Sequence, residues 1–339
     1  MENDFVRSTE RNFRDLFEVA FTSDELKLLA APSSAGTAKT LTIIWLEIFV
    51  LVGAANVAGI GSNPLHLAIT LTIAFLIGTR INALGVVMHE GSHGFLSRNR
   101  LINDRICNLG AAWWLGHSVE EYRPAHRLHH RYLGGERDPD RISSQIPPNR
   151  GALTLLLIQD LFGISAFRKA LVIWSASKDS QVESGGWLGI TGKATAQCLV
   201  IVQFSLLQGS LTQGVLLYLA YWLFPVLCVF ALIQRVKTLV EHYSPELWDP
   251  NMPLWVARSS NSGAIQNHVL GAQMEYHFEH HVVPTIPFAG LKKIHTRLVS
   301  EGTLDRLNTG ERERSHSGGY LQFMVGSFRS LRATAIKTN

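Results

Sequence analysis

Charge is missing from two long stretches of the chain. No Lys or Arg lies between Lys39 and Arg80, where Glu47 is the only acidic residue, and the 41 residues from Ala194 to Gln234 contain no charged residue at all. Over all 339 residues the charged fraction is 17%, below the roughly 25% that is usual in soluble domains. Each stretch is long enough for two membrane-spanning helices of about 20 apolar residues. A buried helix of a soluble core seldom needs so long an uncharged run, so the sequence predicts an integral membrane protein.

Cysteine and nucleotide-binding motifs are also scarce or absent. The three cysteines, Cys107, Cys198 and Cys228, are too few for a disulfide scaffold. They are also too few and too scattered for an iron–sulfur cluster. The chain contains no GxGxxG fingerprint of a dinucleotide site and no His-Pro-Gly-Gly motif of a fused haem domain. The sequence thus contains none of these motifs for a nucleotide, haem or iron–sulfur cofactor.

The two uncharged stretches predict four membrane spans in two helical hairpins. We expect spans over 41–61, 65–87, 194–208 (with a start as early as Leu188) and 214–234. The Gly-, Ser-, Asn- and Pro-containing segments 61–64 and 208–214 are typical of the connecting turns. Arg80 and Asn82 interrupt the second span, so we expect this helix to leave the hydrocarbon near Arg80 and to continue into water.

The basic residues predict the orientation of these spans. All 31 Lys and Arg lie outside the two gaps, in the N-terminal arm, in 80–193 and after 234. The positive-inside rule places these three parts in the cytoplasm. The net charge of +4 then needs no nucleic acid, because an anionic inner leaflet is a sufficient partner. The charged start, Met1–Asp4, is followed by no early apolar run, which predicts that there is no signal peptide.

Eight of the 14 histidines fall into three tight clusters. One cluster reads HExxH and two read HxxHH. The HxxHH pattern is expected roughly 0.02 times by chance in such a chain. Spacings of three and four residues put side chains on one helix face, so each cluster can offer two or three imidazoles to a common point. Zinc takes three or four protein ligands, and eight clustered histidines suit two metal ions of higher coordination number. The eight residues are His89, His93, His126, His129, His130, His277, His280 and His281.

Two other classes of protein remain as alternatives. His89-Glu90-Gly91-Ser92-His93 matches the zinc metalloprotease signature, with Glu90 as general base, but it leaves both HxxHH clusters unexplained. A metal transporter would hold its ligands near the middle of the bilayer, whereas these clusters are expected to meet at the cytoplasmic face. The isolated histidines His66, His295 and His316 are interpreted as solvated or hydrogen-bonded residues.

The clusters and their flanks resemble the integral-membrane fatty acid desaturase and hydroxylase superfamily, in its bacterial form. Tyr122–His126 and Arg137–Asp140 resemble the region of its second histidine box. Residues 276–287, YHFEHHVVPTIP, resemble its third box. The resemblance covers about residues 40–300. It implies one all-α membrane-embedded domain over 1–339 (core 40–300), with a cytoplasmic arm (1–39), a cytoplasmic tail (301–339) and a helical His-rich cap.

The resemblance also implies a ligand set and a reaction. Members use a ninth histidine, for which His242 is the best match and His268 the rival; Thr238 stands where some members carry a further Asn ligand. His117 is a candidate for holding a ligand or a water. The implied cofactor is a non-haem di-iron pair that activates O2. Substrate positioning then decides between desaturation of a fatty acyl chain and hydroxylation or ketolation of an apolar substrate.

The implied partners are a lipid substrate and an electron donor. Electrons from NAD(P)H would arrive through a ferredoxin or cytochrome with its reductase, and the implied location is the bacterial inner membrane. A basic group can dock an acidic carrier or face lipid headgroups; it consists of Arg123, Arg127, Arg131 and Arg137. The short apolar segments 109–115 and 151–167 are expected to lie at the membrane surface.

Overall fold

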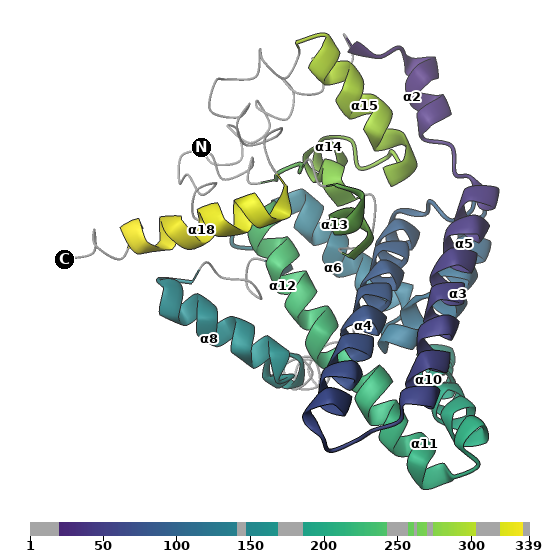
Figure 1. Ribbon diagram of the computed structural model, residues 1–339. Coiled ribbons are helices and arrows are strands. Elements are labelled where there is room, and N and C mark those ends of the chain that lie inside the picture. The colour runs from purple at the N-terminus through teal and green to yellow at the C-terminus, as the bar shows by residue number, and fades with distance from the viewer. Residues whose placement is uncertain are drawn as a thin grey trace.

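The computed structural model describes residues 20–140, 147–168, 186–242, 257–260, 263–269, 274–302 and 319–334. Within these ranges every regular element is a helix (Figure 1). Four segments are long and apolar enough to cross a membrane, as the charge gaps predicted. They are Ser23–Ala58, Pro64–His93, Gly186–Gln208 and Leu211–Glu241.

The first two segments contain α2 (Ser23–Leu29), α3 (Ser34–Ala58) and α4 (Pro64–His93). The side chain of Asn63 accepts a hydrogen bond from the His66 amide at 2.9 Å, and Pro64 takes the first helical position, where its missing N–H costs nothing. The turn begins at Gly59, whose φ of 64° suits glycine. It therefore starts two residues before the predicted 61–64. Helices α3 and α4 then pack side by side.

The other two segments are α10 (Gly186–Gln208) and a composite helix from Leu211 to Glu241. Gly209 and Ser210 alone connect them, so the turn is tighter than the predicted 208–214. The composite helix consists of α11 (Leu211–Tyr218), η2 (Leu219–Leu223), η3 (Pro225–Val229) and α12 (Phe230–Glu241). The π-helical turn η2 precedes Pro225 and η3 begins at it; proline has no N–H for the usual α-helical hydrogen bond.

Helix α4 lies at the centre of the bundle (Figure 1). A Cβ on Gly78 would lie 2.3 Å from Val229 Cγ1, so only glycine lets α4 and η3 approach this closely. Arg80 is 5% exposed. The prediction that α4 enters water near Arg80 is therefore wrong, because this half of the helix continues into the protein interior.

The segment between α4 and the second pair of long helices folds onto the bundle. It forms α5 (Arg100–Gly110), η1 (Ala112–Leu115) and α6 (Val119–Tyr132). The Trp114 ring lies 4.7 Å from the Trp45 ring and 6.3 Å from the Trp222 ring. Trp114 of segment 109–115 thus packs against the bundle, and the expected position of this segment at a membrane surface remains a prediction.

Two further helices lie beside α12 in Figure 1. They are α8 (Arg150–Leu161) and α18 (Tyr320–Thr334). Asp160 of α8 is buried and forms an ion pair with Arg235 of α12, with Oδ2 and Nε 2.7 Å apart. The opposite face of α8 exposes Leu155 and Ile158, and its expected position at a membrane surface remains a prediction.

The third part of the chain forms a cap of short helices at the top of Figure 1. It contains α13 (Ala264–Val269), η4 (Met274–Tyr276), α14 (His277–Val282) and α15 (Phe288–Ser300). Its buried apolar residues include Phe278, Phe288 and Leu291, which pack with Phe21 in one cluster. This packing holds α14 over the end of α4.

Candidate metal centre

Four elements that are distant in sequence meet where α4 ends. Helix α4 brings the first histidine cluster, α6 the second, and α14 the third, while His242 follows the last residue of α12. The capping box of Ser118 and Glu121 starts α6 and so sets which face carries its histidines. The nine predicted histidines form two groups at this junction.

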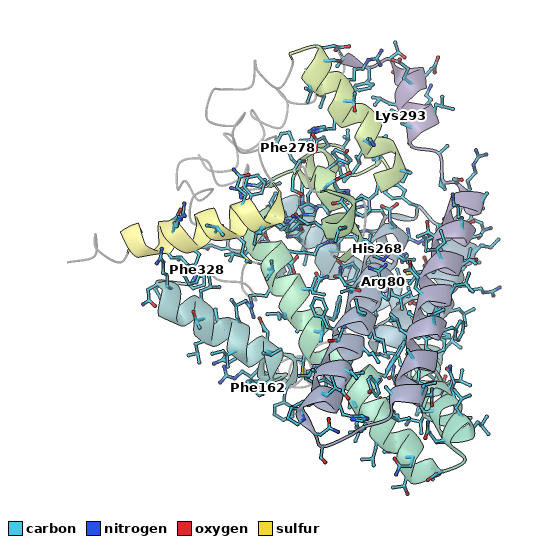
Figure 2. All side chains as sticks on the ribbon, in the orientation of Figure 1. Arg80, Phe162, His268, Phe278, Lys293 and Phe328 are labelled. Carbon is cyan, nitrogen blue, oxygen red and sulfur yellow. The ribbon has the colours of Figure 1, made fainter. Side chains whose placement is uncertain are left out.

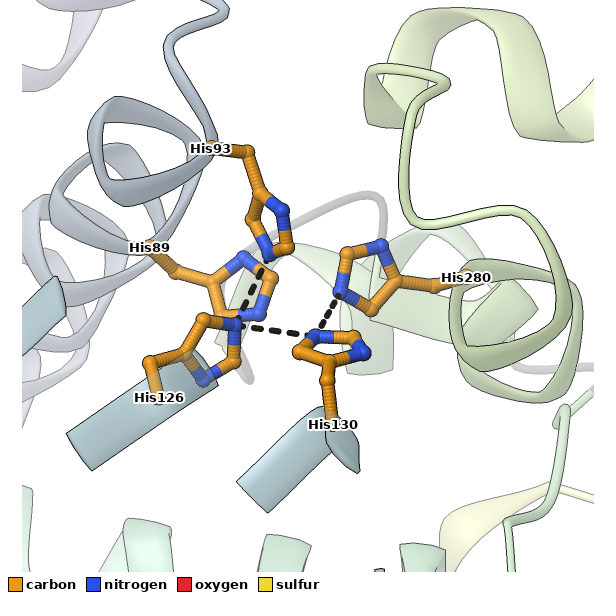
Figure 3. Close-up of side chains that lie close together, drawn as sticks. All are labelled: His89, His93, His126, His130 and His280. Atoms are coloured by element: carbon orange, nitrogen blue, oxygen red, sulfur yellow. Dashed lines mark hydrogen bonds between the residues drawn. The ribbon is translucent and has the colours of Figure 1, made fainter. Parts of the chain in front are cut away.

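The first group contains five imidazoles, carried by α4, α6 and α14, and Figure 3 shows their rings converging. The Nε2 atom of His126 lies 2.8 Å from Nε2 of His93 and 3.1 Å from Nε2 of His130. Nε2 of His280 lies 3.1 Å from Nε2 of His130. The His89 ring closes the group at 4.3 Å from the His126 ring.

The second group contains four imidazoles, from His129, His242, His277 and His281. Nε2 of His277 lies 2.7 Å from Nε2 of His242 and 3.2 Å from Nε2 of His281. The His129 ring is 4.8 Å from the His242 ring and 5.0 Å from the His281 ring. The groups are neighbours, since the His130 and His281 rings stack at 4.4 Å.

Each HxxHH box divides its histidines between the two groups. The pairs four residues apart, His126 with His130 and His277 with His281, stay together, because that spacing places side chains almost directly above one another. His129 and His280, the remaining members, point to the other group. Two of three imidazoles per box therefore share a point, and the third links that box to the neighbouring group.

The chemistry of both groups fits metal ions. Within each group the candidate ligand atoms all lie within 4.8 Å of one another. Burial and neighbouring imidazoles lower the pKa of His126, His130 and His280 well below the usual value. These rings are therefore neutral at pH 7 and offer lone pairs. Within the described part of the chain, several buried ring nitrogens have no hydrogen-bond partner, among them both nitrogens of His89 and Nδ1 of His130, His277, His280 and His281.

Asp138 orients His129, whose pKa is raised instead of lowered. Its Oδ1 lies 2.9 Å from Nδ1 of His129, and its Oδ2 accepts a hydrogen bond from the Gly134 amide. Burial lowers the pKa of His129, but the hydrogen bond to Asp138 and the charges of Asp138, Asp140 and Glu241 outweigh it, so the net pKa is raised. Occupying Nδ1 directs Nε2 toward the second group. The sequence contained Asp138 in a recognised motif but gave no sign of this role.

Arg123 of α6 forms hydrogen bonds to the end of α4. Its guanidinium donates to the carbonyls of Ser92 and Gly91 at 2.9 and 3.1 Å and to the Asp104 carboxylate. Arg123 is buried, so its predicted place in a docking surface is wrong. The other three arginines of that set, Arg127, Arg131 and Arg137, are exposed.

Glu90 makes a structural contact with the cap. Its carboxylate accepts a hydrogen bond from the Phe288 amide, with Oε2 at 3.3 Å. Phe288 begins α15, where Pro287 supplies no side-chain cap, so Glu90 caps that helix from α4. This contact gives the Glu of the HExxH motif a structural role.

His268 lies outside both groups. Figure 2 shows it next to Arg80, whose guanidinium contacts the His268 carbonyl and lies 2.9 Å from Glu47 Oε2. The side chain of His268 is 57% exposed. The structure thus brings His242, and not His268, to the other eight histidines.

The remaining histidines have separate environments. His117 is exposed and lies in neither group of candidate ligands, so its suggested role in holding a ligand or a water remains a prediction. His66 is half-buried, with Nδ1 2.9 Å from Asn63 Nδ2, as predicted for a hydrogen-bonded residue. His295 is hydrogen-bonded to Glu279 at 2.5 Å, also as predicted. His316 lies outside the described residues.

Comparisons with known proteins relate this chain to desaturases. The model of the fatty acid desaturase family matches residues 63–311. A dihydrorhizobitoxine desaturase from Bradyrhizobium elkanii is 28% identical over 232 residues, which cover 64% of this chain and 64% of that protein. An sn-1 oleoyl-lipid 12-desaturase from Picosynechococcus sp. is 26% identical over 243 residues, 67% of this chain and 68% of that protein.

The matched family region contains all three clusters and His242. It extends over most of the chain, including the long apolar helices from α4 onward. The chain therefore belongs to the fatty acid desaturase family.

Proposed function

We propose that this protein is an O2-dependent non-haem di-iron desaturase that introduces a double bond into a fatty acyl chain or a similar lipid. The observation that carries the proposal is the convergence of nine histidines into one group of five and one group of four. Each group supports one iron ion, and no single zinc ion needs so many imidazoles.

The proposed ligands are the nine histidines of the two groups. A bound di-iron pair would supply O2 activation and removal of hydrogen from an unactivated C–H bond. Loss of one hydrogen from each of two adjacent carbons, with two electrons and two protons from outside, reduces one O2 to two water molecules. The ligand set is His89, His93, His126, His130 and His280 for one iron, and His129, His242, His277 and His281 for the other.

The chain's own residues position the ligands and exclude water from the reaction. Asp138 fixes the ring of His129, and the contacts of Arg123 fix α6 against α4. His126 and His280 are 6% and 0% exposed, so the protein excludes bulk water around the reacting atoms. Positioning of the acyl chain beside the groups then decides which C–H bonds react.

The proposed topology is one membrane-embedded domain (core 40–300) with two hairpins of membrane-spanning helices. Its helical cap lies in the cytoplasm. This topology is supported by the four apolar helices and by the absence of basic residues from both connecting turns. The bacterial inner membrane is the proposed location, since both relatives are bacterial. An acyl substrate enters from the bilayer, and NAD(P)H-derived electrons arrive through a ferredoxin or cytochrome.

A hydroxylase or ketolase of the same superfamily is the second candidate, because the ligand groups do not distinguish these outcomes. The names of both relatives favour desaturation. A membrane zinc protease is disfavoured by the contact of Glu90 with Phe288.

Two measurements test the proposal. The purified protein should contain about two iron ions per chain, one for each histidine group. A single zinc ion would refute it. Mass spectrometry of lipids from cells with and without the gene should then show products two hydrogens lighter; products that gain an oxygen would support the hydroxylase.

A further inference from the structure

An open groove lies between α2 and α15, outside both histidine groups. Its volume is about 620 Å³. Both helices are at the top of Figure 1, at the end of the molecule opposite to the connecting turns 59–63 and 209–210. In the proposed topology this end is the farthest from the bilayer, so a soluble partner can reach it. The lining combines apolar and basic side chains, among them Leu28, Leu29, Lys292, Lys293, Thr296 and Arg297.

The groove carries positive charge that the described residues do not neutralise. Arg297 is paired with Glu25, with Nη1 and Oε1 2.8 Å apart. Lys292 and Lys293, which Figure 2 labels at Lys293, are exposed, and neither has an ion pair within the described parts of the chain. Leu28 lines the same groove and is 79% exposed. Two uncompensated cations beside an exposed apolar side chain favour an acidic protein as the partner.

Helix α15 lies between this groove and the first histidine group. Its first residue is Phe288, whose ring stacks on the His89 ring at 5.1 Å and lies 5.1 Å from the His280 ring. Lys292 follows one helical turn later, about 6 Å further along the helix axis. A partner in the groove is therefore separated from the candidate metal centre by one helix.

The inner face of α15 is closely packed. Leu291 and Ile294 are both 0% exposed, and they pack in one cluster with Phe278 of α14. An acyl chain delivered from the groove would need an opening through this packing. Electron transfer needs no such opening, so the geometry favours a partner that delivers electrons over one that delivers substrate.

We propose that the groove between α2 and α15 docks an acidic electron carrier protein of the ferredoxin type. This inference rests on the proposed function, which requires electrons from outside. Each docking event passes one electron from a reduced carrier to the centre, so two carriers are oxidised for each double bond. With two protons and the two hydrogens of the substrate, these two electrons complete the reduction of one O2 to two water molecules.

The test uses a plant-type [2Fe–2S] ferredoxin as the probe and the full chain, purified in detergent and loaded with iron. The variants are Lys292→Glu/Lys293→Glu and Leu28→Ala. The control, Arg168→Glu/Arg329→Glu, makes the same change of charge at two exposed residues outside the groove. Calorimetry measures ferredoxin affinity at low and high salt. Anaerobic stopped-flow measures reduction of the centre by reduced ferredoxin and by reduced methyl viologen, a small donor that needs no docking site.

We expect Lys292→Glu/Lys293→Glu to bind ferredoxin about tenfold or more weakly at low salt, because the exposed lysines attract the acidic carrier. High salt should reduce this difference, since it screens exposed charges. Leu28→Ala should weaken binding at both salt concentrations, and the control should match wild type. Reduction by ferredoxin should slow in the lysine variant, whereas reduction by methyl viologen should not.

Four results would overturn the inference. They are no binding of ferredoxin to wild type, equal affinity in wild type and the lysine variant, an equal loss in the control, and tighter binding of an acyl carrier protein than of ferredoxin at the same lysines. If wild type holds two irons and is reduced by methyl viologen while one of these results is found, only this inference fails. If wild type holds no iron, the proposed function fails whatever the affinity for ferredoxin.

Discussion

The Nε2 atoms of His242 and His277 lie 2.7 Å apart, although 35 residues separate them in the sequence. The contact joins the end of α12 to the start of α14. It brings His242, which directly follows the last long apolar helix, into the same group as two members of the third cluster.

His242→Ala should abolish desaturation and remove iron from the second group, while the protein stays in the membrane. The backbone hydrogen bond from the His242 amide to Thr238 survives the change, so α12 is retained. His126→Ala and His280→Ala should likewise abolish activity. Lipid profiling measures the loss of desaturation, membrane fractionation checks that the protein stays in the membrane, and metal analysis measures the loss of iron.

His268→Ala is the matched control for that prediction. His268 is more than half exposed and lies beside Arg80 and Glu47, so its loss should leave iron content unchanged. Full activity in His242→Ala would refute its role as the ninth ligand.

Asp138→Asn should lower iron affinity by about 10- to 100-fold, because partners that orient a metal-binding histidine typically contribute that much. The carboxylate holds Nδ1 of His129 at 2.9 Å. The comparison is Asp140→Asn, whose carboxylate lies 3.5 Å from the same nitrogen and is 53% exposed. Titration of the apoprotein with Fe(II) measures the difference; equal affinities in the two variants would contradict the prediction.

Glu90→Ala should destabilise the cap while Glu90→Gln should not. Alanine leaves the Phe288 amide without its acceptor, at a cost of about 1–3 kcal/mol for a buried group. The amide oxygen of glutamine still accepts that hydrogen bond. Thermal unfolding in detergent measures stability, and lipid profiling should show that Glu90→Gln still desaturates. Loss of all activity in Glu90→Gln would instead favour a catalytic base.

Gly78→Leu should destabilise the bundle by about 1–3 kcal/mol, the usual range for overpacking a tight interface. Even a Cβ at Gly78 would lie 2.3 Å from Val229 Cγ1. Gly53→Leu in α3 is the control, because a Cβ there meets nothing within 4 Å. The melting temperatures of both variants in the same detergent decide the point, and equal values would contradict the close approach of α4 to η3.

The fold was predictable where the signal is local. The length of an uncharged run decides whether a helix can cross a membrane, so the gaps after Lys39 and from Ala194 to Gln234 predicted four apolar helices. The ends of the helices were less predictable. Turn formation depends on which residue caps the next helix, and Ser210 caps α11 within the predicted turn.

Burial of individual charges could not be predicted from the sequence. Arg80 suggested an exit into water and Arg123 a docking surface, yet both are buried. Each found its partners on other helices, Glu47 and His268 for Arg80 and Asp104 for Arg123. Partners from other elements depend on packing, which residue type alone does not specify.

The sequence by itself determined which histidines could share a helix face. Cluster spacing placed imidazoles on helix faces, because the helical repeat is a property of the local backbone. Only the tertiary structure decided how the nine imidazoles divide, with His130 beside His280 and His129 beside His242. Those distances join residues more than 100 positions apart, and they exist only because α4, α6, α12 and α14 pack at one junction.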